Sequence, residues 1–160
     1  MTDTGITIEP LTDTELLRAL LRRRWGETLM MFGRAWQPGE YSALVAYDAE
    51  RQPVGLVTYA IQKSTLLGLT IDNFSSQPGI GRLLMAALTE IGRQQGAKAL
   101  RVVTTNDNTP ALRYFQIRGF RIVAFYPGAI AIYRAFTPGL PEKGVDGIPM
   151  RDAIELEIDL

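Results

Sequence analysis

The chain of 160 residues contains neither cysteine nor histidine. The absence of cysteine excludes disulfides and thiolate nucleophiles, and the absence of both residue types excludes Cys/His zinc sites. Without histidine there is no Ser-His-Asp triad and no imidazole base. Any acid–base chemistry must therefore use Asp, Glu, Tyr, Lys, water or the backbone, and we expect no metal site.

An excess of charge of either sign is also absent. Lysine and arginine together number 17, as do aspartate and glutamate, and the pI is about 6.3. This balance argues against a nucleic-acid partner, which requires a basic surface. The one basic run, Arg22 to Arg24, is interpreted as a solvated helix face, with an anionic partner as the alternative.

Long apolar runs are missing as well. None reaches the roughly 18 residues of a membrane span, and no signal peptide opens the chain, so we expect a cytoplasmic protein without a membrane partner. Hydrophobic content is 46% and charged content 21%. These values are typical of a globular protein, and we expect residues 1–160 to form a single domain.

Hydrophobic periodicity predicts alternating strands and helices. Helices are expected from Thr12 or Asp13 to about Trp25, from Gly81 to Gln95, and from Asn108 or Thr109 to Gly119. Residues 26–38 and 126–151 fit neither pattern and are expected to be irregular. Strands are expected at residues 6–9, 42–47, 54–61, 65–71, 99–103, 121–125 and 155–160.

Residues 77–84 read Gln-Pro-Gly-Ile-Gly-Arg-Leu-Leu, between a predicted strand and the most regular predicted helix. Gly79 and Gly81 allow a tight turn, and a helix N-terminus supplies free N–H groups to an anion. A dinucleotide-binding loop would need a third glycine where Leu84 stands, and a Walker loop would need Gly-Lys-Ser/Thr. An ordinary turn with two glycines remains the alternative.

A second motif, Asn-Thr-Pro-Ala-Leu-Arg-Tyr-Phe-Gln-Ile-Arg-Gly-Phe, occupies residues 108–120. Together the two motifs resemble the GNAT superfamily of acyl-CoA-dependent N-acetyltransferases, whose Asn-x-x-Ala-x-x-x-Tyr-x-x-x-Gly-Phe pattern Asn108, Ala111, Gly119 and Phe120 match. The resemblance covers most of the chain. It implies an α/β (α+β) fold, with a mixed, mostly antiparallel sheet of six to seven strands. That sheet would be splayed between strands 4 and 5 and flanked by about four helices.

The resemblance also implies acetyl-CoA, or another acyl-CoA, as co-substrate. Backbone of the fourth strand would pair with the pantetheine arm, in the manner of an added strand. Backbone N–H groups of the glycine loop would bind the pyrophosphate, and Asn108 would hydrogen-bond the pantetheine, with a helix cap as its simpler role. The implied cofactor residues are Leu69, Ile71, Asn73, Gln77, Gly79, Ile80, Gly81, Arg82 and Asn108.

The implied reaction is direct attack of a primary amine on the thioester. Family members use a tyrosine as the acid, but Phe115 stands at that position, which leaves the adjacent Tyr114 as the candidate. For the base we single out Glu155, with Asp72 and Glu157 as alternatives. Each of these three carboxylates has the simpler interpretation of a solvated group at a strand edge.

Two further departures concern the cofactor loop. Ser76 replaces a longer polar residue, and Pro78 lacks an N–H. We expect an N-acetyltransferase acting on a small molecule or peptide amine, and a non-catalytic acyl-CoA-binding module is the alternative. The acceptor pocket would include the apolar segment of Met30, Met31, Phe32 and Trp36. For the oligomeric state, a homodimer is one alternative.

Overall fold

The computed structural model describes residues 4–160, and seven of its strands form one sheet. These are β1 (Thr7–Pro10), β4 (Ser42–Tyr47), β5 (Pro53–Gln62), β6 (Thr65–Asn73), β7 (Ala99–Thr105), β8 (Arg121–Tyr126) and β9 (Ala153–Asp159). Their order is β1-β4-β5-β6-β7-β9-β8. Within residues 4–160, all neighbouring strands are antiparallel except β6 and β7. The predicted mixed, mostly antiparallel sheet is confirmed.

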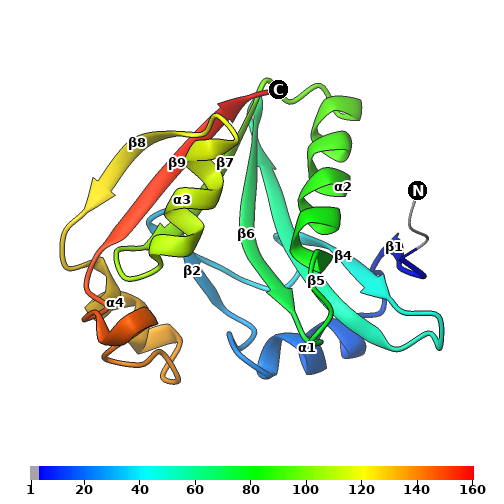
Figure 1. Cartoon of the computed structure of the whole chain (residues 1–160), viewed down its shortest axis with the longest axis horizontal. Coiled ribbons are helices and arrows are strands. Elements are labelled where there is room, and N and C mark those ends of the chain that lie inside the picture. Colours follow the sequence, from blue (N-terminus) through cyan, green and yellow to red (C-terminus); the bar gives the residue numbers. More distant parts are fainter. Residues whose placement is uncertain (1–3) are drawn as a thin grey trace.

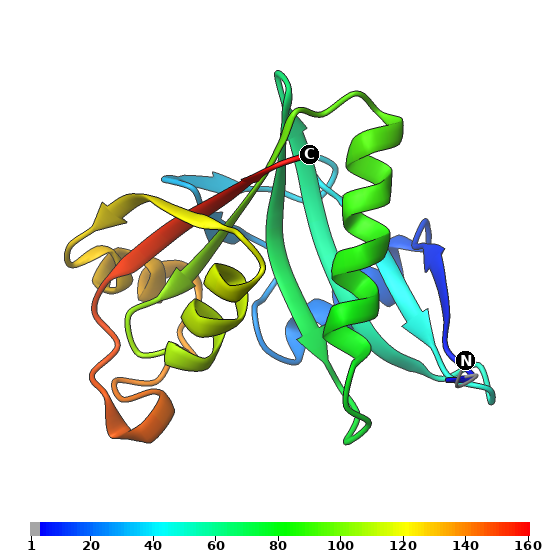
Figure 2. The ribbon, with the colours of Figure 1, turned by 45° about the horizontal axis from the view of Figure 1, so that its top comes forward.

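The sheet opens between its fourth and fifth strands, as expected. β6 pairs with β7 only from Thr65 to Gly68, although β6 continues to Asn73. In Figures 1 and 2 the two strands start together and then diverge. A bulge accompanies the opening: Gly68 faces Tyr59 and Thr70 faces Thr58, so Leu69 has no facing residue in β5. Bulges bend a strand, and this one turns β6 away from β7.

In the described part of the chain four α-helices flank the sheet, which matches the expected number. They are α1 (Thr14–Arg22), α2 (Ile80–Gln94), α3 (Thr109–Ile117) and α4 (Ala129–Phe136). Asp13 starts α1, because its Oδ1 accepts hydrogen bonds from the N–H groups of Glu15 (3.0 Å) and Leu16 (3.2 Å). Asn108 starts α3 through its side chain.

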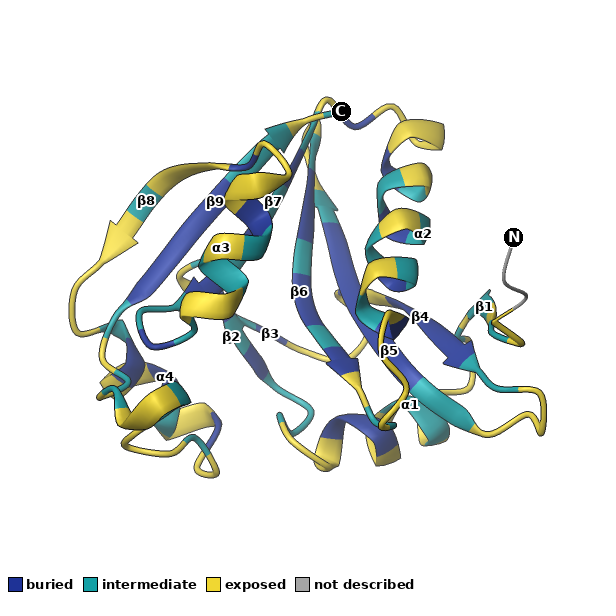
Figure 3. Cartoon of the chain, viewed as in Figure 1, coloured by how far each residue is buried: buried dark blue, intermediate teal, exposed yellow. Residues whose placement is uncertain are grey.

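The two faces of the sheet carry separate cores. On one face α2 packs through Ile80, Leu84 and Leu88, which are fully buried in one apolar cluster. On the other face α1 contributes Leu20 and Leu21 to a second cluster. Figure 1 shows α2 beside β6 with its lower end in front of β5, and α1 below them. In Figure 3 the central strands are mostly buried, whereas the edge strand β8 is mostly exposed.

Residues 26–38, expected to be irregular, form a short hairpin of β2 (Leu29–Met31) and β3 (Arg34–Trp36). Phe32 and Gly33 form its turn with φ of 53° and 72°. Two positive φ values suit a tight hairpin, but the usual Asn-Gly signal is missing, so no local motif predicted this turn.

Residues 126–151, expected to be a long excursion, contain α4 and a 3-10 turn, η1 (Val145–Gly147). Gly128, with φ of 72°, precedes α4 without a side-chain cap, which explains why the start of this helix was missed. No helix within residues 4–160 has both the length and the apolar character required to cross a bilayer.

Candidate functional site

A cavity of about 410 Å³ occupies the opening between β6 and β7. Residues of β6, β7, α2, α3 and α4 line it, together with the segment that follows α1. It therefore reaches both faces of the sheet. Most of its lining side chains are apolar, so its few polar groups stand out as candidates for recognition and chemistry.

The free side of β6 presents Leu69, Ile71 and Asn73, which all line the cavity. The N–H of Thr70 donates to Thr58 Oγ1 (3.1 Å) and that of Phe74 to the carbonyl of Val54 (2.8 Å), so both point toward β5. Successive N–H groups of a strand point to opposite sides, which directs those of Ile71 and Asn73 toward the opening. An extended ligand can therefore pair with β6 there.

The glycine loop brings the start of α2 to the same cavity. Gly79 has φ of 90° and precedes α2 without a side-chain cap, and the first turn holds no acidic residue. The first N–H groups of the helix thus remain available, and Gly81 and Arg82 line the cavity. The side chain of Ile80 is fully buried in the core, so only its backbone can serve a ligand.

The backbone of Gln77 is already engaged within the loop. Its N–H donates to Ser75 Oγ (3.1 Å), and its carbonyl accepts from Asn73 Nδ2 (2.8 Å). Ser75 in turn donates to Asn73 Oδ1 (2.9 Å). This network fixes the loop, and Gln77 would have to exchange a partner to bind a phosphate.

Asn108 serves as a helix cap and lines the cavity at the same time. Its Oδ1 accepts a hydrogen bond from the N–H of Ala111 at 3.2 Å. Asn108 therefore has the simpler of its two predicted roles, that of a helix cap. The amide is also held in one orientation at the cavity wall, which is compatible with a second role toward a ligand.

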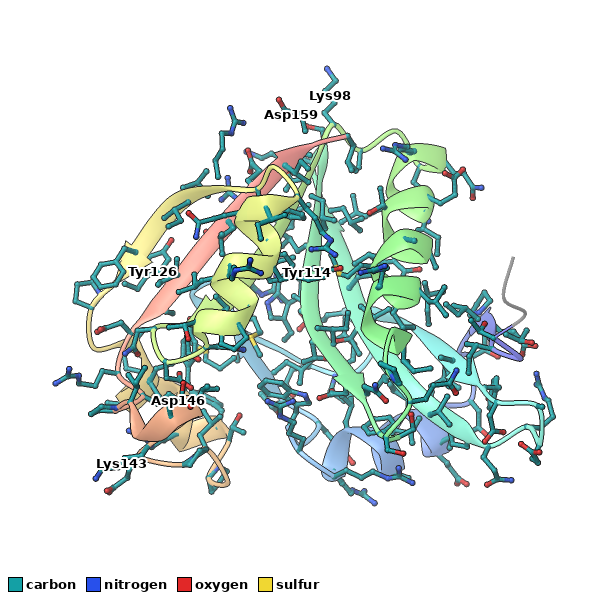
Figure 4. The ribbon with its side chains drawn as sticks, in the orientation of Figure 1. Lys98, Tyr114, Tyr126, Lys143, Asp146 and Asp159 are labelled. Carbon is teal, nitrogen blue, oxygen red and sulfur yellow. The ribbon has the colours of Figure 1, made fainter. Side chains whose placement is uncertain are left out.

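Two adjacent aromatic residues of α3, Tyr114 and Phe115, both line the cavity. In Figure 4 Tyr114 lies on the side of α3 that faces α2. The guanidinium of Arg118 stacks on the Tyr114 ring at 3.5 Å, whereas Phe115 packs against Phe120 in the core, with ring centroids 5.0 Å apart. The Tyr114 ring, which carries the hydroxyl, therefore borders the cavity.

Glu155 is buried on β9, between Val103 of β7 and Ala124 of β8. Its carboxylate lies 3.5 Å from Arg101 Nη1, and its side chain is only 3% exposed. It lies behind the cavity wall, close to Tyr133 of α4, which does line the cavity. Burial, and then the charge of Glu155, raise the pKa of the Tyr133 hydroxyl.

Asp72 is a second buried carboxylate near the cavity. Its Oδ2 accepts from Trp25 Nε1 (2.7 Å), and its Oδ1 accepts from Arg24 Nη1 (3.0 Å). Burial raises its pKa, and the hydrogen bond from Trp25 and the charge of Arg24 offset part of that rise. Arg24 and Trp25 line the cavity. Asp72 is thus a buried and partnered group, not a solvated one.

The Acetyltransferase (GNAT) family matches residues 14–120 of the sequence. The chain belongs to the GNAT acetyltransferase family. The Bacillus subtilis protein YxbD is 28% identical over 91% of this chain and 92% of its own.

Solved structures share the fold. The IAA acetyltransferase from Bacillus cereus superposes with a TM-score of 0.75 at 20% identity, covering 97% of this chain and 99% of its own. A GNAT family acetyltransferase from Elizabethkingia anophelis, solved with acetyl-CoA bound, gives 0.72 at 21% identity, covering 99% and 100%. These likenesses confirm the predicted GNAT fold.

Within this GNAT domain, the structure gathers most of the predicted residues at one cavity. Met31 of the apolar segment lines it, whereas Trp36 is buried and donates its indole N–H to the carbonyl of Met31 (3.0 Å). Glu157 lies away from it, paired with Arg101 at 2.7 Å. The residues described here form no cluster of side chains suited to a metal ion.

The cavity residues that sequence reasoning missed include Arg24, Trp25 and Tyr133. Arg24 was part of a basic run that was interpreted as solvated. Tyr133 belongs to the helix that the sequence did not reveal. Arg24 and Trp25 could have been noticed as a cation beside an aromatic residue just after a helix, but nothing in that pattern alone points to a cavity.

Proposed function

We propose that this protein transfers the acetyl group of acetyl-CoA to a primary amine by direct attack. The observation that carries the proposal is the continuity of one cavity. It runs from the uncapped N-terminus of α2, past the free side of β6, to Tyr133 on the other face of the sheet. The cavity would thus connect a phosphate site at the start of α2, the free side of β6 and a pocket beside Tyr133. This is the order in which acetyl-CoA and an amine would have to meet.

Acetyl-CoA would bind on the α2 side. The backbone of Leu69, Ile71 and Asn73 would pair with the pantetheine, and the amide of Asn108 would bind it from α3. The pyrophosphate would meet the N–H groups around α2, because a helix N-terminus favours negative charge. The proposed phosphate-binding residues are Gln77, Gly79, Ile80, Gly81 and Arg82.

The amine would approach from the side of α4 and the segment after α1. In the reaction the amine nitrogen forms a bond to the thioester carbon, the carbon–sulfur bond breaks, and CoA leaves as a thiolate. One proton must leave the nitrogen and one must reach the sulfur. We assign the second transfer to Tyr114 and the first to Glu155, acting through water or through the neighbouring Tyr133.

The roles of the two tyrosines differ. A raised pKa keeps the hydroxyl of Tyr133 protonated at neutral pH, so it can donate a hydrogen bond near the amine but is a poor base on its own. Glu155 lies close enough to influence that hydroxyl. Proton removal by Glu155 would therefore be indirect, which matches its position behind the cavity wall.

A second candidate is a non-catalytic acyl-CoA-binding module of the same fold. Phe115 favours it, because this residue lines the cavity where family members carry a tyrosine. Ser76 and Pro78 favour it less directly, since they remove groups that would help to seat the phosphates.

Two experiments test the proposal. Calorimetric titration with acetyl-CoA should give saturable one-to-one binding. Thiol release with acetyl-CoA and a broad panel of primary amines should then exceed the rate without protein. Binding without thiol release for any amine would favour the non-catalytic module, and no binding at millimolar acetyl-CoA would overturn both candidates.

A further inference from the structure

We propose that the acceptor is an apolar amine that also carries an anionic oxygen group, and that Arg24 binds this group. The inference rests on the proposed acetyl transfer and narrows its acceptor to a chemical class. It is drawn from the position of Arg24, from the charges that line the cavity, and from the apolar surroundings.

The position of Arg24 assigns it to the acceptor half of the cavity. Neighbouring residues of a strand point to opposite faces, and Ile71 packs with the cluster beneath α2. Asp72 therefore points to the other face, where it holds Arg24 and Trp25. The guanidinium thus lies across the sheet from the glycine loop, on the side where α4 contributes Tyr133.

Among the described residues, the guanidinium of Arg24 has one hydrogen-bond partner, Asp72. Its Nη1 donates to Asp72 at 3.0 Å, and its central carbon lies 4.9 Å from the centre of the Trp25 ring. An arginine has five N–H donors in a planar fork, and this arrangement leaves most of them free for a ligand. The Arg24 side chain is 62% exposed, whereas that of Asp72 is 4% exposed. A ligand in the cavity would consequently meet the cation and not the carboxylate behind it.

The charges around the cavity point in the same direction. Among the residues that the structure describes, its lining includes two charged side chains, Arg24 and Arg82, and no carboxylate. Arg82, at the start of α2, lies where the phosphates of acetyl-CoA are proposed to bind. Arg24 is therefore the charge left for the acceptor, and a polycationic acceptor would find no anionic partner in this lining.

Apart from the Tyr133 hydroxyl, most of the acceptor half is apolar. Met31 of β2, Ile130 of α4 and Met150 line it together with the Trp25 ring. An acceptor that fills this space gains by burying apolar surface. A hydrophobic α-amino acid has the required combination of amine, apolar side chain and anionic group, and its phosphonate analogue has the same combination.

The experiment compares matched acceptors. Phenylalanine and phenethylamine share the ring and the amine, but only phenylalanine has the carboxylate, and (1-amino-2-phenylethyl)phosphonate carries a phosphonate instead. Thiol release with saturating acetyl-CoA gives kcat/KM for each. We expect kcat/KM for at least one anionic acceptor to exceed that for phenethylamine by about tenfold, the value of one hydrogen bond to a charged group. The better of the two anionic acceptors identifies the group that is recognised.

Arg24→Gln should reduce this ratio to about one. Arg24→Lys should restore part of it, because the charge returns without the fork. Arg23→Gln is the matched control: the neighbouring arginine stacks on Phe74 at 5.0 Å and does not line the cavity, so the ratio should persist. Thermal melting of each variant verifies folding, since Arg24 partners a buried carboxylate. A ratio near one in the unsubstituted protein, or a ratio unchanged in a folded Arg24→Gln, would overturn the inference.

Failure of acetyl transfer itself gives a different result. If no amine releases thiol, the proposed function fails, and product-like ligands then test the site directly. In the presence of CoA, N-acetylphenylalanine should bind more tightly than N-acetylphenethylamine, with the difference lost in Arg24→Gln. Equal binding of the two ligands to the unsubstituted protein would contradict the anionic site independently of any catalysis.

Discussion

Gly55 of β5 lies directly against Ile80, the first residue of α2. A β-carbon at position 55 would be 2.5 Å from Cγ2 of Ile80 and 3.1 Å from the carbonyl oxygen of Asp72. Neither neighbour is free to retreat, because Ile80 is fully buried and the carbonyl belongs to the paired part of β6. The missing side chain at Gly55 thus sets how closely the start of α2, and with it the proposed phosphate site, approaches the sheet.

We expect Gly55→Ala to lower the free energy of unfolding by about 1–3 kcal/mol, the usual cost of overpacking a core. It should also weaken acetyl-CoA binding, because the start of α2 must shift outward. Urea denaturation and calorimetric titration measure the two effects. Gly139→Ala is the control: a β-carbon there has no heavy atom within 4 Å, so both quantities should change little. Equal stability of the two variants would show that Ile80 can move to accommodate the β-carbon.

Gly81→Glu should abolish acetyl-CoA binding while leaving the fold intact. A β-carbon at this position has no heavy atom within 4 Å, and Gly81 lines the cavity at the proposed phosphate site. The introduced carboxylate would repel the pyrophosphate and occupy its volume. Gln95→Glu places the same charge at the exposed C-terminal end of the helix and should bind normally. Calorimetry compares the two, and unchanged affinity in Gly81→Glu would show that the phosphates bind elsewhere.

Much of this architecture could be predicted because local signals agree with the final packing. The periodic helix α2 buries Leu84 and Leu88 as expected, and Gly79 adopts the positive φ that its position in the loop suggested. The alternation of β9 was informative in part: Leu156 is fully buried in the core, but Glu155, interpreted as solvated, is buried as well. In each case a short stretch of sequence determines which side chains face the sheet.

Most of the proposed acceptor side could not be predicted, since it depends on contacts between distant segments. Trp25 and Asp72 are 47 positions apart and meet only when the segment after α1 packs beneath β6. Tyr133 approaches Glu155 only because α4 folds back against the end of the sheet. No local pattern in the sequence records these encounters.

Asp72 should give stability an unusual dependence on pH. Its pKa is raised in the folded state, so the folded protein holds this proton more strongly than the unfolded chain does. The resulting stabilisation is present below the unfolded pKa of about 3.9 and is lost as the pH rises through the raised folded pKa. Asp72→Asn removes this contribution while keeping the shape of the side chain.

The measurement is the free energy of unfolding from pH 4 upward. The difference between Asp72→Asn and the unsubstituted protein should move in favour of the variant as the pH rises. Asp159→Asn, which removes a carboxylate whose side chain is 79% exposed, controls for the loss of a negative charge alone. A difference that does not vary with pH would show that burial does not govern Asp72.

Tyr114→Phe should lower kcat by about a hundredfold, the lower end of the usual contribution from general acid catalysis. The lower end applies because a thiolate leaves readily. The ring remains to line the cavity and to stack under Arg118, so acetyl-CoA affinity should persist. Steady-state thiol release measures kcat, and Tyr133→Phe is the comparison. A larger loss in Tyr133→Phe than in Tyr114→Phe would assign the acid to α4.

Phe115→Tyr tests whether a hydroxyl at the family's position is useful in this chain. Phe115 lines the cavity, is 8% exposed, and packs edge-on against Tyr114 at 5.3 Å. A hydroxyl that reaches the cavity would donate a proton to the departing sulfur, and we expect kcat to rise by about two- to tenfold, up to the value of one hydrogen bond. Phe120→Tyr adds a hydroxyl to the same aromatic cluster but away from this cavity and should leave kcat unchanged. Thermal melting separates catalysis from packing, because a hydroxyl without a partner would destabilise the core without increasing turnover. An unchanged kcat in a stable Phe115→Tyr would mean that Tyr114 or water already protonates the thiolate.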